Sequence, residues 1–410
     1  PSAAEPSAAV PPPASRASSA VGAATAPSQA PLGVWLTTVD SAVLYEPAEA
    51  RQALAFLQAN GFRRAALPLY TAGTVLWSPA PWRNPLGIPI DPRLPDTFGR
   101  GPGPTASLLT ALGQGGIERV GWFEFGLMAP RQAPWLRGRE DLLLRDASGA
   151  TGWQESPGLE RVWLNPMQPE VQQLLEDLVV DACTSLPLDA VQFDDHLGYP
   201  VRFGYDAFTL AAWRASEGGR RDPSPDPLHP AWIAWRSQQV TALLERLRGA
   251  MRSACPQVRL SVSPNPQEFS YSSYLADWSD WVRRGLVDEV VVQIYRQQLG
   301  ALKRELAHPS LAAASRRVPV RIGLLAGLRS QPKDPALLRR ELALVRERGF
   351  SGIDLFFYES ARLQFAGQSS APAQAEAPAE AETQPAASQL PAGASVAPHV
   401  TPGVSPQVSP

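Results

Sequence analysis

The sequence lacks several features that would assign it to a common functional class. No apolar run reaches the roughly 18 residues that a membrane-spanning helix needs, so we expect no transmembrane segment. The net charge is −2, which gives no electrostatic basis for binding nucleic acid or an anionic membrane surface. Lysine is almost absent, since Lys303 and Lys333 are the two lysines and all other basic residues are arginine. We interpret the arginine content as compositional bias rather than a binding motif.

Cysteine is also scarce, and this excludes a disulfide-rich scaffold. Cys183 falls in an apolar helical pattern and Cys255 directly precedes a proline. We favour the interpretation that both are buried thiols, while a single disulfide between them stays an alternative. Neither their spacing nor their neighbours indicate zinc. The sequence predicts no cofactor and no metal.

Both ends of the chain have few large apolar residues. Residues 1–30 and 367–410 consist mainly of proline, serine and alanine. Such segments bury too little surface to offset the entropy of ordering, so we predict a disordered linker and a disordered tail. The folded domain is then expected over residues 31–366.

Within residues 31–366, strand-like apolar runs recur and alternate with helical or long loop segments. Several runs are almost continuously apolar, as is typical of parallel strands buried on both faces. The eight runs are GVWLTTVD from Gly33, RRAALPLY from Arg63, IERVGWFEFGL from Ile117, LDAVQFDD from Leu188, VRLSVSP from Val258, VDEVVVQIY from Val287, VPVRIGLLAG from Val318 and FSGIDLFFYES from Phe350.

The segments between these runs carry helix signals. One has Pro47 near its start and Gly61 after its end, a second has Asn165 as a predicted N-cap, and a third begins at Asp334 and stops at Gly349. Eight strand–helix alternations predict an α/β fold, a (β/α)8 TIM barrel. An open doubly wound sheet is the alternative, but the first strand is not followed by the glycine-rich loop typical of that fold.

Carboxylates follow the predicted strands at the barrel end where active sites lie. Because side chains alternate along a strand, Ala190, Gln192 and Asp194 should point inward, with Asp195 on the rim. The same alternation turns Glu124 toward the mouth from the neighbouring strand. Adjacent strands lie about 4.8 Å apart, so staggered carboxylates can reach the roughly 5–10 Å separations used by glycosidases.

Other strand-end residues extend this candidate site. A strand-end aspartate often caps a helix or turn, and Glu359 has Arg362 as an available partner. Several such residues at one barrel end are more informative than any one. Sugars bind through hydrogen bonds and aromatic faces, so we predict a substrate site that includes Asp40, Trp77, Trp82, Trp122, His196, Tyr199, Asn265, Gln293, Tyr295 and Glu359.

These motifs resemble the glycosyl hydrolase-like 10 family of bacterial envelope proteins. The resemblance rests on GVWLTTVDS, on the stretch from LPLYTAG to LWSPAPW, on VWLNPMQPEVQQLLEDLVVD with LDAVQFDDHLGYP, and on SVSPNP, LVDEVVVQIY and RIGLLAG in order. It covers residues 31–361. An aromatic residue commonly follows the paired aspartates in that family, where this chain has His196, and its third strand has WFEFGL where many relatives carry an asparagine-containing segment.

The resemblance implies a TIM-barrel glycoside hydrolase whose substrate is a polysaccharide, with peptidoglycan glycan strands as the expected class. We assign Asp194 as nucleophile, base or charge stabiliser, Glu124 as general acid, and Asp195 as a further catalytic residue. A non-catalytic glycan-binding barrel is the main alternative, and metal-assisted hydrolysis through Asp194, Asp195 and His196 is a weaker one. The family also implies location in the cell envelope, periplasmic or secreted.

Overall fold

The computed structural model describes residues 30–95, 103–156, 159–216, 222–329 and 331–366. The two segments predicted to be disordered lie outside these residues, except for Ala30. Within the described part, no helix is both long and apolar enough to cross a bilayer.

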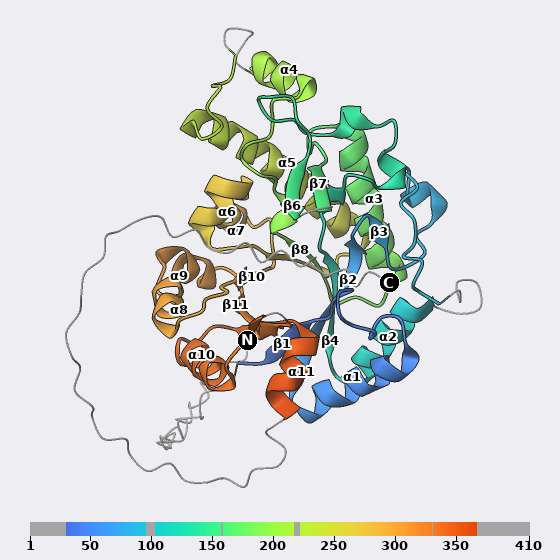
Figure 1. Ribbon diagram of the computed structural model, residues 1–410, viewed down its shortest axis with the longest axis vertical. Coiled ribbons are helices and arrows are strands. Elements are labelled where there is room, and N and C mark those ends of the chain that lie inside the picture. Colours follow the sequence, from blue (N-terminus) through green and yellow to red (C-terminus); the bar gives the residue numbers. More distant parts are fainter. Residues whose placement is uncertain (1–29, 96–102, 157–158, 217–221, 330, 367–410) are drawn as a thin grey trace, which may run out of the picture.

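Eight parallel strands form a closed barrel, which confirms the predicted TIM-barrel fold and all eight predicted strands (Figure 1). Each strand pairs with the next along the chain, and β1 closes the ring by pairing with both β2 and β14. The strands are β1 (Leu32–Trp35), β2 (Phe62–Thr71), β4 (Glu118–Phe123), β8 (Ala190–Asp194), β9 (Arg259–Ser263), β10 (Glu289–Gln293), β11 (Val320–Leu325) and β14 (Gly352–Phe356).

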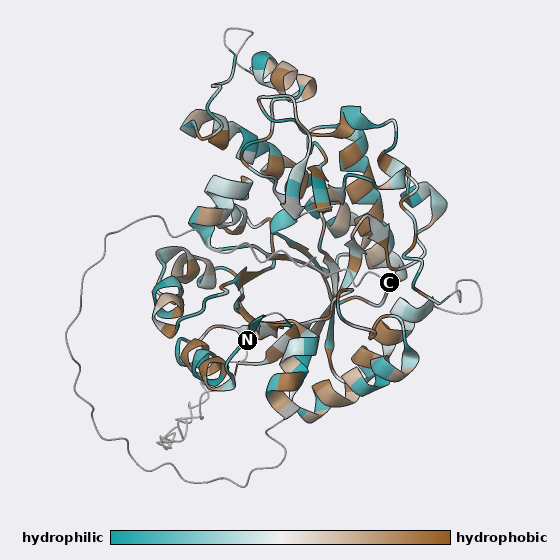
Figure 2. Ribbon diagram, viewed as in Figure 1, coloured by the Kyte–Doolittle hydropathy of each residue, from teal (hydrophilic) through white to brown (hydrophobic). Residues whose placement is uncertain are grey.

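Helices surround the barrel and turn apolar side chains toward it, and Figure 2 shows hydrophobic and hydrophilic residues alternating along them. They are α1 (Pro47–Ala59), α2 (Gly103–Gln114), α3 (Pro169–Ser185), α4 (Ala207–Ser216), α5 (Pro230–Ala254), α6 (Gln267–Tyr274), α7 (Trp278–Arg283), α8 (Leu299–Leu306), α9 (Pro309–Ser315), α10 (Pro335–Glu347) and α11 (Tyr358–Ala366).

The predicted helix boundaries are correct at two helices and wrong at a third. Pro47 is the first residue of α1, and Asp334 caps α10 by accepting a hydrogen bond from the backbone N–H of Ala336. Asn165 does not cap α3, which begins only at Pro169. Its amide instead accepts from the N–H of Met167 and donates to Asp206, so it fixes the loop before the helix.

Charged side chains fill the barrel interior at the end where the strands begin. Arg64 lies 2.6 Å from Glu289, and Arg321 lies 2.6 Å from Asp354, with all four side chains almost fully buried. A side chain at Gly33 would place its Cβ 1.8 Å from a carboxylate oxygen of Asp354, so glycine is required there. Buried charges need partners, and this network of ion pairs supplies them inside the barrel.

Short strands and 3-10 turns lie in the segments that follow the barrel strands. The segment between β4 and α3 forms a three-stranded antiparallel sheet, and short strands β12 and β13 form a hairpin after β11. These elements are β3 (Thr74–Val75), β5 (Met128–Pro130), β6 (Trp153–Ser156), β7 (Leu159–Trp163), β12 (Gly327–Leu328) and β13 (Gln331–Pro332), with 3-10 turns η1 (Pro81–Arg83), η2 (Pro134–Leu136), η3 (Glu140–Leu142) and η4 (Asp195–Leu197).

Cys183 and Cys255 form a disulfide, so the favoured interpretation of two buried thiols is wrong. The pairing follows from helix packing, because α3 and α5 lie against each other and both cysteines are near the C-terminal ends of these helices. The bond joins residues 72 positions apart in the sequence. Neither the local patterns nor the spacing could distinguish this bond from two thiols.

Candidate active site

Aromatic side chains line the barrel mouth, where the strands end. Trp35 lies with its ring centre 6.5 Å from that of Trp122 and 6.2 Å from that of Phe356. Tyr295 stacks on Phe356 at 5.7 Å. Trp122 and Tyr295 were predicted as site residues, whereas Trp35 and Phe356 were not. The alternation of side chains that places Asp194 inward also applies to the ends of β1 and β14, and it could have predicted that Trp35 and Phe356 point inward.

Hydrogen bonds hold this aromatic floor on the polar interior below it. The indole N–H of Trp35 donates to Gln192 at 2.9 Å, and the amide of Gln192 donates to Ser261 at 3.0 Å. The Ser261 hydroxyl donates to Glu289 at 2.9 Å. Because every member of this chain is buried, the floor of the mouth is rigidly connected to the charged network below.

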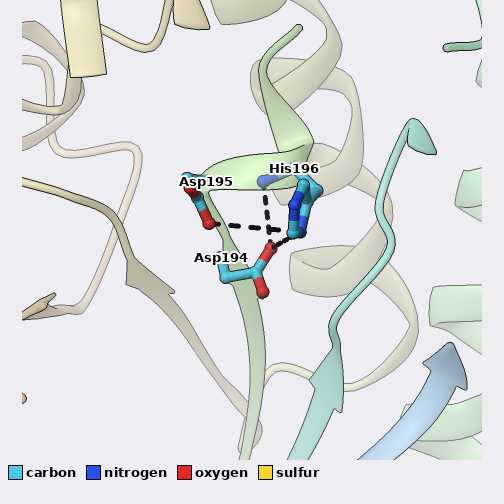
Figure 3. Close-up of side chains that lie close together, drawn as sticks. All are labelled: Asp194, Asp195 and His196. Carbon is cyan, nitrogen blue, oxygen red and sulfur yellow. Dashed lines mark hydrogen bonds and ion pairs between the residues drawn. The ribbon is translucent and has the colours of Figure 1, made fainter. Parts of the chain in front are cut away.

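Asp194 points inward at the end of β8, as the alternation predicts, and pairs with His196 (Figure 3). Its Oδ1 atom accepts from the backbone N–H of His196 at 2.9 Å and lies 3.1 Å from the imidazole Nδ1. The same Nδ1 lies 2.8 Å from the backbone carbonyl of Glu124. His196, predicted as a substrate-binding residue, is therefore a buried link between the two catalytic candidates.

Burial and mutual charge shift the pKa values of this pair. Burial raises the pKa of Asp194 to about 6, although the nearby imidazole opposes part of that rise. Burial alone would lower the pKa of His196, but the carboxylates of Asp194 and Asp195 outweigh it and raise that pKa to about 10. The pair is therefore a carboxylate beside an imidazolium at neutral pH, with Oδ1 of Asp194 occupied by two donors.

Glu124 lies in the bend directly after β4 and is 4% exposed. Its Oε2 atom accepts a hydrogen bond from the hydroxyl of Thr71 at 2.5 Å. Burial is the main cause that raises the pKa of Glu124 to about 7, and the negative charge of Asp194 adds to it. The result is a carboxyl group that keeps its proton close to neutral pH, near a second carboxyl group with a somewhat lower pKa that lies beside an imidazolium.

Asp195 is the more accessible carboxylate, because its side chain is 16% exposed against 3% for Asp194. Asn265 donates to it at 2.7 Å, which brings two predicted site residues together. Gln293, half-buried at the end of β10, donates to the carbonyl of Ser263 at 2.6 Å. The mouth thus combines aromatic faces with amides and one partly exposed carboxylate.

The structure places Trp77 and Trp82 away from this mouth. After β2 the chain doubles back, because β3 pairs antiparallel with β2 along the outside of the barrel. Trp77 is buried there and donates to Asp181 on α3 at 2.7 Å. Trp82 is 77% exposed on η1, next to Arg83, which pairs with Asp177 on α3. The predicted aromatic pair is therefore not part of the site.

Three further predicted residues have other roles in the structure. Asp40 is exposed beyond the end of β1 and pairs with Arg329 at 3.3 Å. Glu359 lies in the first turn of α11 and pairs with Arg362 at 3.0 Å, the bond anticipated from the sequence. Tyr199 is fully buried, and its hydroxyl has no hydrogen-bond partner among the described residues. Among the described residues, none of the three has a hydrogen bond or ion pair with Asp194.

Asp194, Asp195 and His196 lie close enough together to offer three ligand atoms to a metal ion, all within 4.8 Å of one another. The donor set fits poorly, because Nδ1 of His196 already contacts a carbonyl and a carboxylate, and Asp194 Oδ1 already accepts twice. The geometry instead supports an ion pair.

An apolar hollow lies elsewhere, between α1 and α2. It has a volume of about 430 Å³ and is lined mainly by apolar side chains, including Leu44, Leu54 and Leu108. It contains none of the mouth carboxylates. Chemistry therefore identifies the barrel mouth, rather than this apolar hollow, as the candidate active site.

Comparisons with known proteins agree with the fold. The chain is 27% identical over 158 residues to glycosyl hydrolase DigH of Escherichia coli O6:H1, a match that spans 35% of this chain and 34% of that protein. Two solved structures share the fold at 14% identity and cover 82% of this chain. They are the PgaB (BpsB) glycoside hydrolase domain from Bordetella bronchiseptica, with a TM-score of 0.59 over 97% of that chain, and alpha-L-fucosidase isoenzyme 2 from Paenibacillus thiaminolyticus, with a TM-score of 0.55 over 49% of that chain.

The family model described as glycosyl hydrolase-like 10 matches residues 32–337. That range contains seven of the eight barrel strands, from β1 to β11, together with Asp194, Asp195 and Glu124. The match covers well over half of the chain, so this protein belongs to the glycosyl hydrolase-like 10 family.

Proposed function

We propose that this protein is a glycoside hydrolase that cleaves glycan strands, with peptidoglycan as its substrate class. The observation that carries the proposal is the pair of buried carboxyl groups at the mouth, which differ in their partners. Burial raises the pKa of Glu124 to about 7 and that of Asp194 to about 6, and Asp194 alone of the two lies beside the imidazole of His196. Glycosidases use two carboxyl groups, one to give a proton and one to carry negative charge, and the group with the higher pKa suits the first role.

The roles follow from the protonation states. Glu124 gives its proton to the glycosidic oxygen as the bond to the anomeric carbon breaks. Asp194 presents Oδ2, the oxygen not engaged by His196, to the positive charge that develops on the sugar ring, or to the water that attacks it. Asp195 and Asn265 lie where they can hold sugar hydroxyls, and the rings of Trp122 and Tyr295 offer apolar faces.

The cell envelope is the proposed location. The disulfide between Cys183 and Cys255 supports it, because such bonds persist in oxidising compartments outside the cytoplasm. The peptidoglycan assignment rests on the resemblance of the sequence motifs to a bacterial envelope family. Both the location and the substrate class are proposals.

A glycan-binding barrel without catalysis is the second candidate. It is favoured by the low exposure of the two carboxyl side chains, since Asp194 is 3% and Glu124 is 4% exposed. A catalytic acid must reach the glycosidic oxygen, so the glycosidase requires the mouth to open slightly around the substrate.

Product analysis distinguishes the two candidates. Purified protein is incubated with peptidoglycan glycan strands, with and without stem peptides, and with chitin oligosaccharides, and products are identified by mass spectrometry. Shorter saccharides that differ from the substrate by addition of water establish the glycosidase. Retained binding with no product from any glycan establishes the binding barrel, and activity that chelators abolish contradicts carboxylate catalysis without metal.

A further inference from the structure

A groove runs between α10 and α11, the last two helices of the described chain, on the outside of the barrel. It has a volume of about 290 Å³. Its lining includes Leu338, Arg339, Leu342, Arg346, Gln364 and Phe365. At 3.6 residues per turn, the four residues from α10 share one side of that helix. The groove therefore has an apolar floor, with two arginines on the α10 wall and an amide on the α11 wall.

Polar groups in this groove have incomplete sets of partners. Arg339 is exposed and Arg346 is half-buried, and neither side chain forms a hydrogen bond or ion pair with a residue that the structure describes. The amide N–H groups of Gln364 donate to the backbone carbonyls of Ala326 at 3.1 Å and Lys333 at 2.9 Å. Its carbonyl Oε1 has no partner in the described part of the chain. The groove thus suits an occupant that offers acceptors to the arginines and a donor to the glutamine.

The acidic residues of the same helix do not neutralise the groove. Asp334 and Glu347 are exposed, but neither lines the groove, and Asp334 is engaged as the N-cap that accepts from the N–H of Ala336. Glu341 is buried and pairs with Lys333 at 2.5 Å. The residues that line the groove therefore carry two positive charges and no negative charge.

The sequence that follows α11 is acidic and begins beside the groove. Residues 367–410 start two positions after Phe365, and they contain three glutamates but no aspartate, lysine or arginine. All three glutamates fall in residues 371–382, APAQAEAPAEAE, where only small side chains and one glutamine separate them. Residues 1–29, in contrast, contain one glutamate and one arginine. Negative charge outside the described residues is therefore concentrated in the segment tethered next to the two free arginines.

The spacing of the acids matches that of the arginines. Arg339 and Arg346 are seven residues apart on α10, which is about 10 Å along the helix axis. Glu376 and Glu380 are four residues apart with Pro378 between them, and an extended or polyproline segment of that length spans about 12–13 Å. The long side chains of both residue types cover the small difference. The ten residues from the end of α11 to Glu376 can span up to about 33 Å, so the tether does not limit the reach.

We propose that this groove binds residues 371–382 of the same chain, with Glu376 paired to Arg346 and Glu380 paired to Arg339. A carboxylate can accept two parallel hydrogen bonds from a guanidinium, so each arginine gains the acceptors that the described residues do not give it. The alanines and prolines between the acids are small enough to lie on the leucines of the groove floor. Because the segment is tethered to α11, its effective concentration at the groove is high, and weak contacts suffice to hold it.

The proposed pairing sets the direction of the segment. Barrel helices run from the mouth back to the end where the strands begin, so α11 ends at the side away from the mouth. Arg346 lies near the end of α10 and Arg339 near its start, so a segment that meets them in this order runs back toward the mouth. Residues 383–410 then leave the barrel at the mouth end, on the side of the candidate active site.

Digestion with glutamyl endopeptidase, which cleaves after glutamate, tests the proposal on the full chain and needs no glycan. A synthetic peptide of residues 371–384 is digested in the same solution as a reference without a groove, and mass spectrometry follows cleavage after Glu376 in both. The test variant is Arg339→Glu. The matched control is Arg340→Glu, because Arg340 is the exposed neighbour on the same helix and does not line the groove.

We expect the groove to protect the segment from cleavage. Since two exposed ion pairs correspond to a factor of about three to ten, wild type and control should be cleaved after Glu376 about three- to ten-fold more slowly than the peptide. High salt should remove this difference. Arg339→Glu should be cleaved at nearly the rate of the peptide, and the addition of Glu380→Arg to that variant should restore the protection.

The opposite results overturn the proposal. Wild type cleaved as fast as the peptide shows that the segment is not bound, and equal rates in Arg339→Glu and Arg340→Glu show that the groove is not the site. Protection that is lost when the protein is diluted overturns binding within one chain and assigns the groove to the same segment of a second copy.

Discussion

Glu124→Gln should make the stability of this protein less dependent on pH, because it replaces a buried acid by a group that does not titrate. In the folded protein the pKa of Glu124 is raised from 4.5 to about 7, mainly by burial. A carboxyl whose pKa is higher in the folded state gives its stabilising contribution below pH 4.5 and loses it as the pH rises through 7. Gln preserves the acceptor for Thr71 and cannot ionise.

The magnitude follows from that pKa difference. At about 1.36 kcal/mol for each pH unit between 4.5 and about 7, the free energy of unfolding of the wild type falls by about 3 kcal/mol through the ionisation of Glu124. The variant does not lose this contribution. The free energy of unfolding of the variant, relative to that of the wild type, should therefore increase by about 3 kcal/mol between pH 4.5 and pH 8, whatever the difference between them at the lower pH.

Urea unfolding at both pH values, followed by tryptophan fluorescence, measures this gain directly. Titrating groups distant from Glu124 are common to both proteins and cancel in the difference. A difference in unfolding free energy that is the same at pH 4.5 and pH 8 refutes the reasoning, because Glu124 would then ionise as an exposed carboxyl does. It would also remove Glu124 as the proton donor.

Three further predictions concern other parts of the structure. His196→Asn keeps a donor near Asp194 but removes the positive charge, so the pKa values of Asp194 and Glu124 should rise. Both limbs of the pH–rate profile should then move to higher pH, and exposed His229→Asn is the control. An unmoved profile contradicts the ion pair. The double change Cys183→Ser and Cys255→Ser opens a loop of 72 residues and should lower the free energy of unfolding by about 2–4 kcal/mol, and unchanged urea midpoints would show that the bond does not form. Arg64→Met leaves buried Glu289 with the more distant Arg259, at 3.6 Å, in place of Arg64 at 2.6 Å, and should cost about 3–5 kcal/mol in urea unfolding. Arg63→Met on the exposed side of β2 should cost little, and similar losses from the two variants would contradict the buried network.

Local patterns in the sequence predicted the barrel and the central carboxylates. The eight strands could be read from apolar runs, and Asp194 from the alternation along LDAVQFDD, because both depend on residues that are near one another in the chain. The same reasoning placed Asp195 and Asn265 at one end of the barrel, where the structure joins them by a hydrogen bond, because parallel strands end at the same side.

Features that depend on distant contacts were not predicted. The loop after β2 has an aromatic pattern typical of a sugar platform, but only the antiparallel pairing of β3 turns Trp77 outward against Asp181. His196 follows two acids in the sequence, yet its burial depends on the carbonyl of Glu124, 72 residues earlier. The disulfide likewise required the packing of α3 on α5, which no local pattern encodes.

Release of new reducing ends from glycan strands by Asp194→Asn tests the central claim most directly. Asp189→Asn is the matched control, because Asp189 precedes the same strand at its opposite end and pairs there with Arg119. We predict that Asp194→Asn lowers the rate by about a hundred-fold or more while glycan binding is retained, and that the control keeps wild-type activity. Wild-type rates from Asp194→Asn would contradict the claim that the mouth carboxylates carry out glycan hydrolysis.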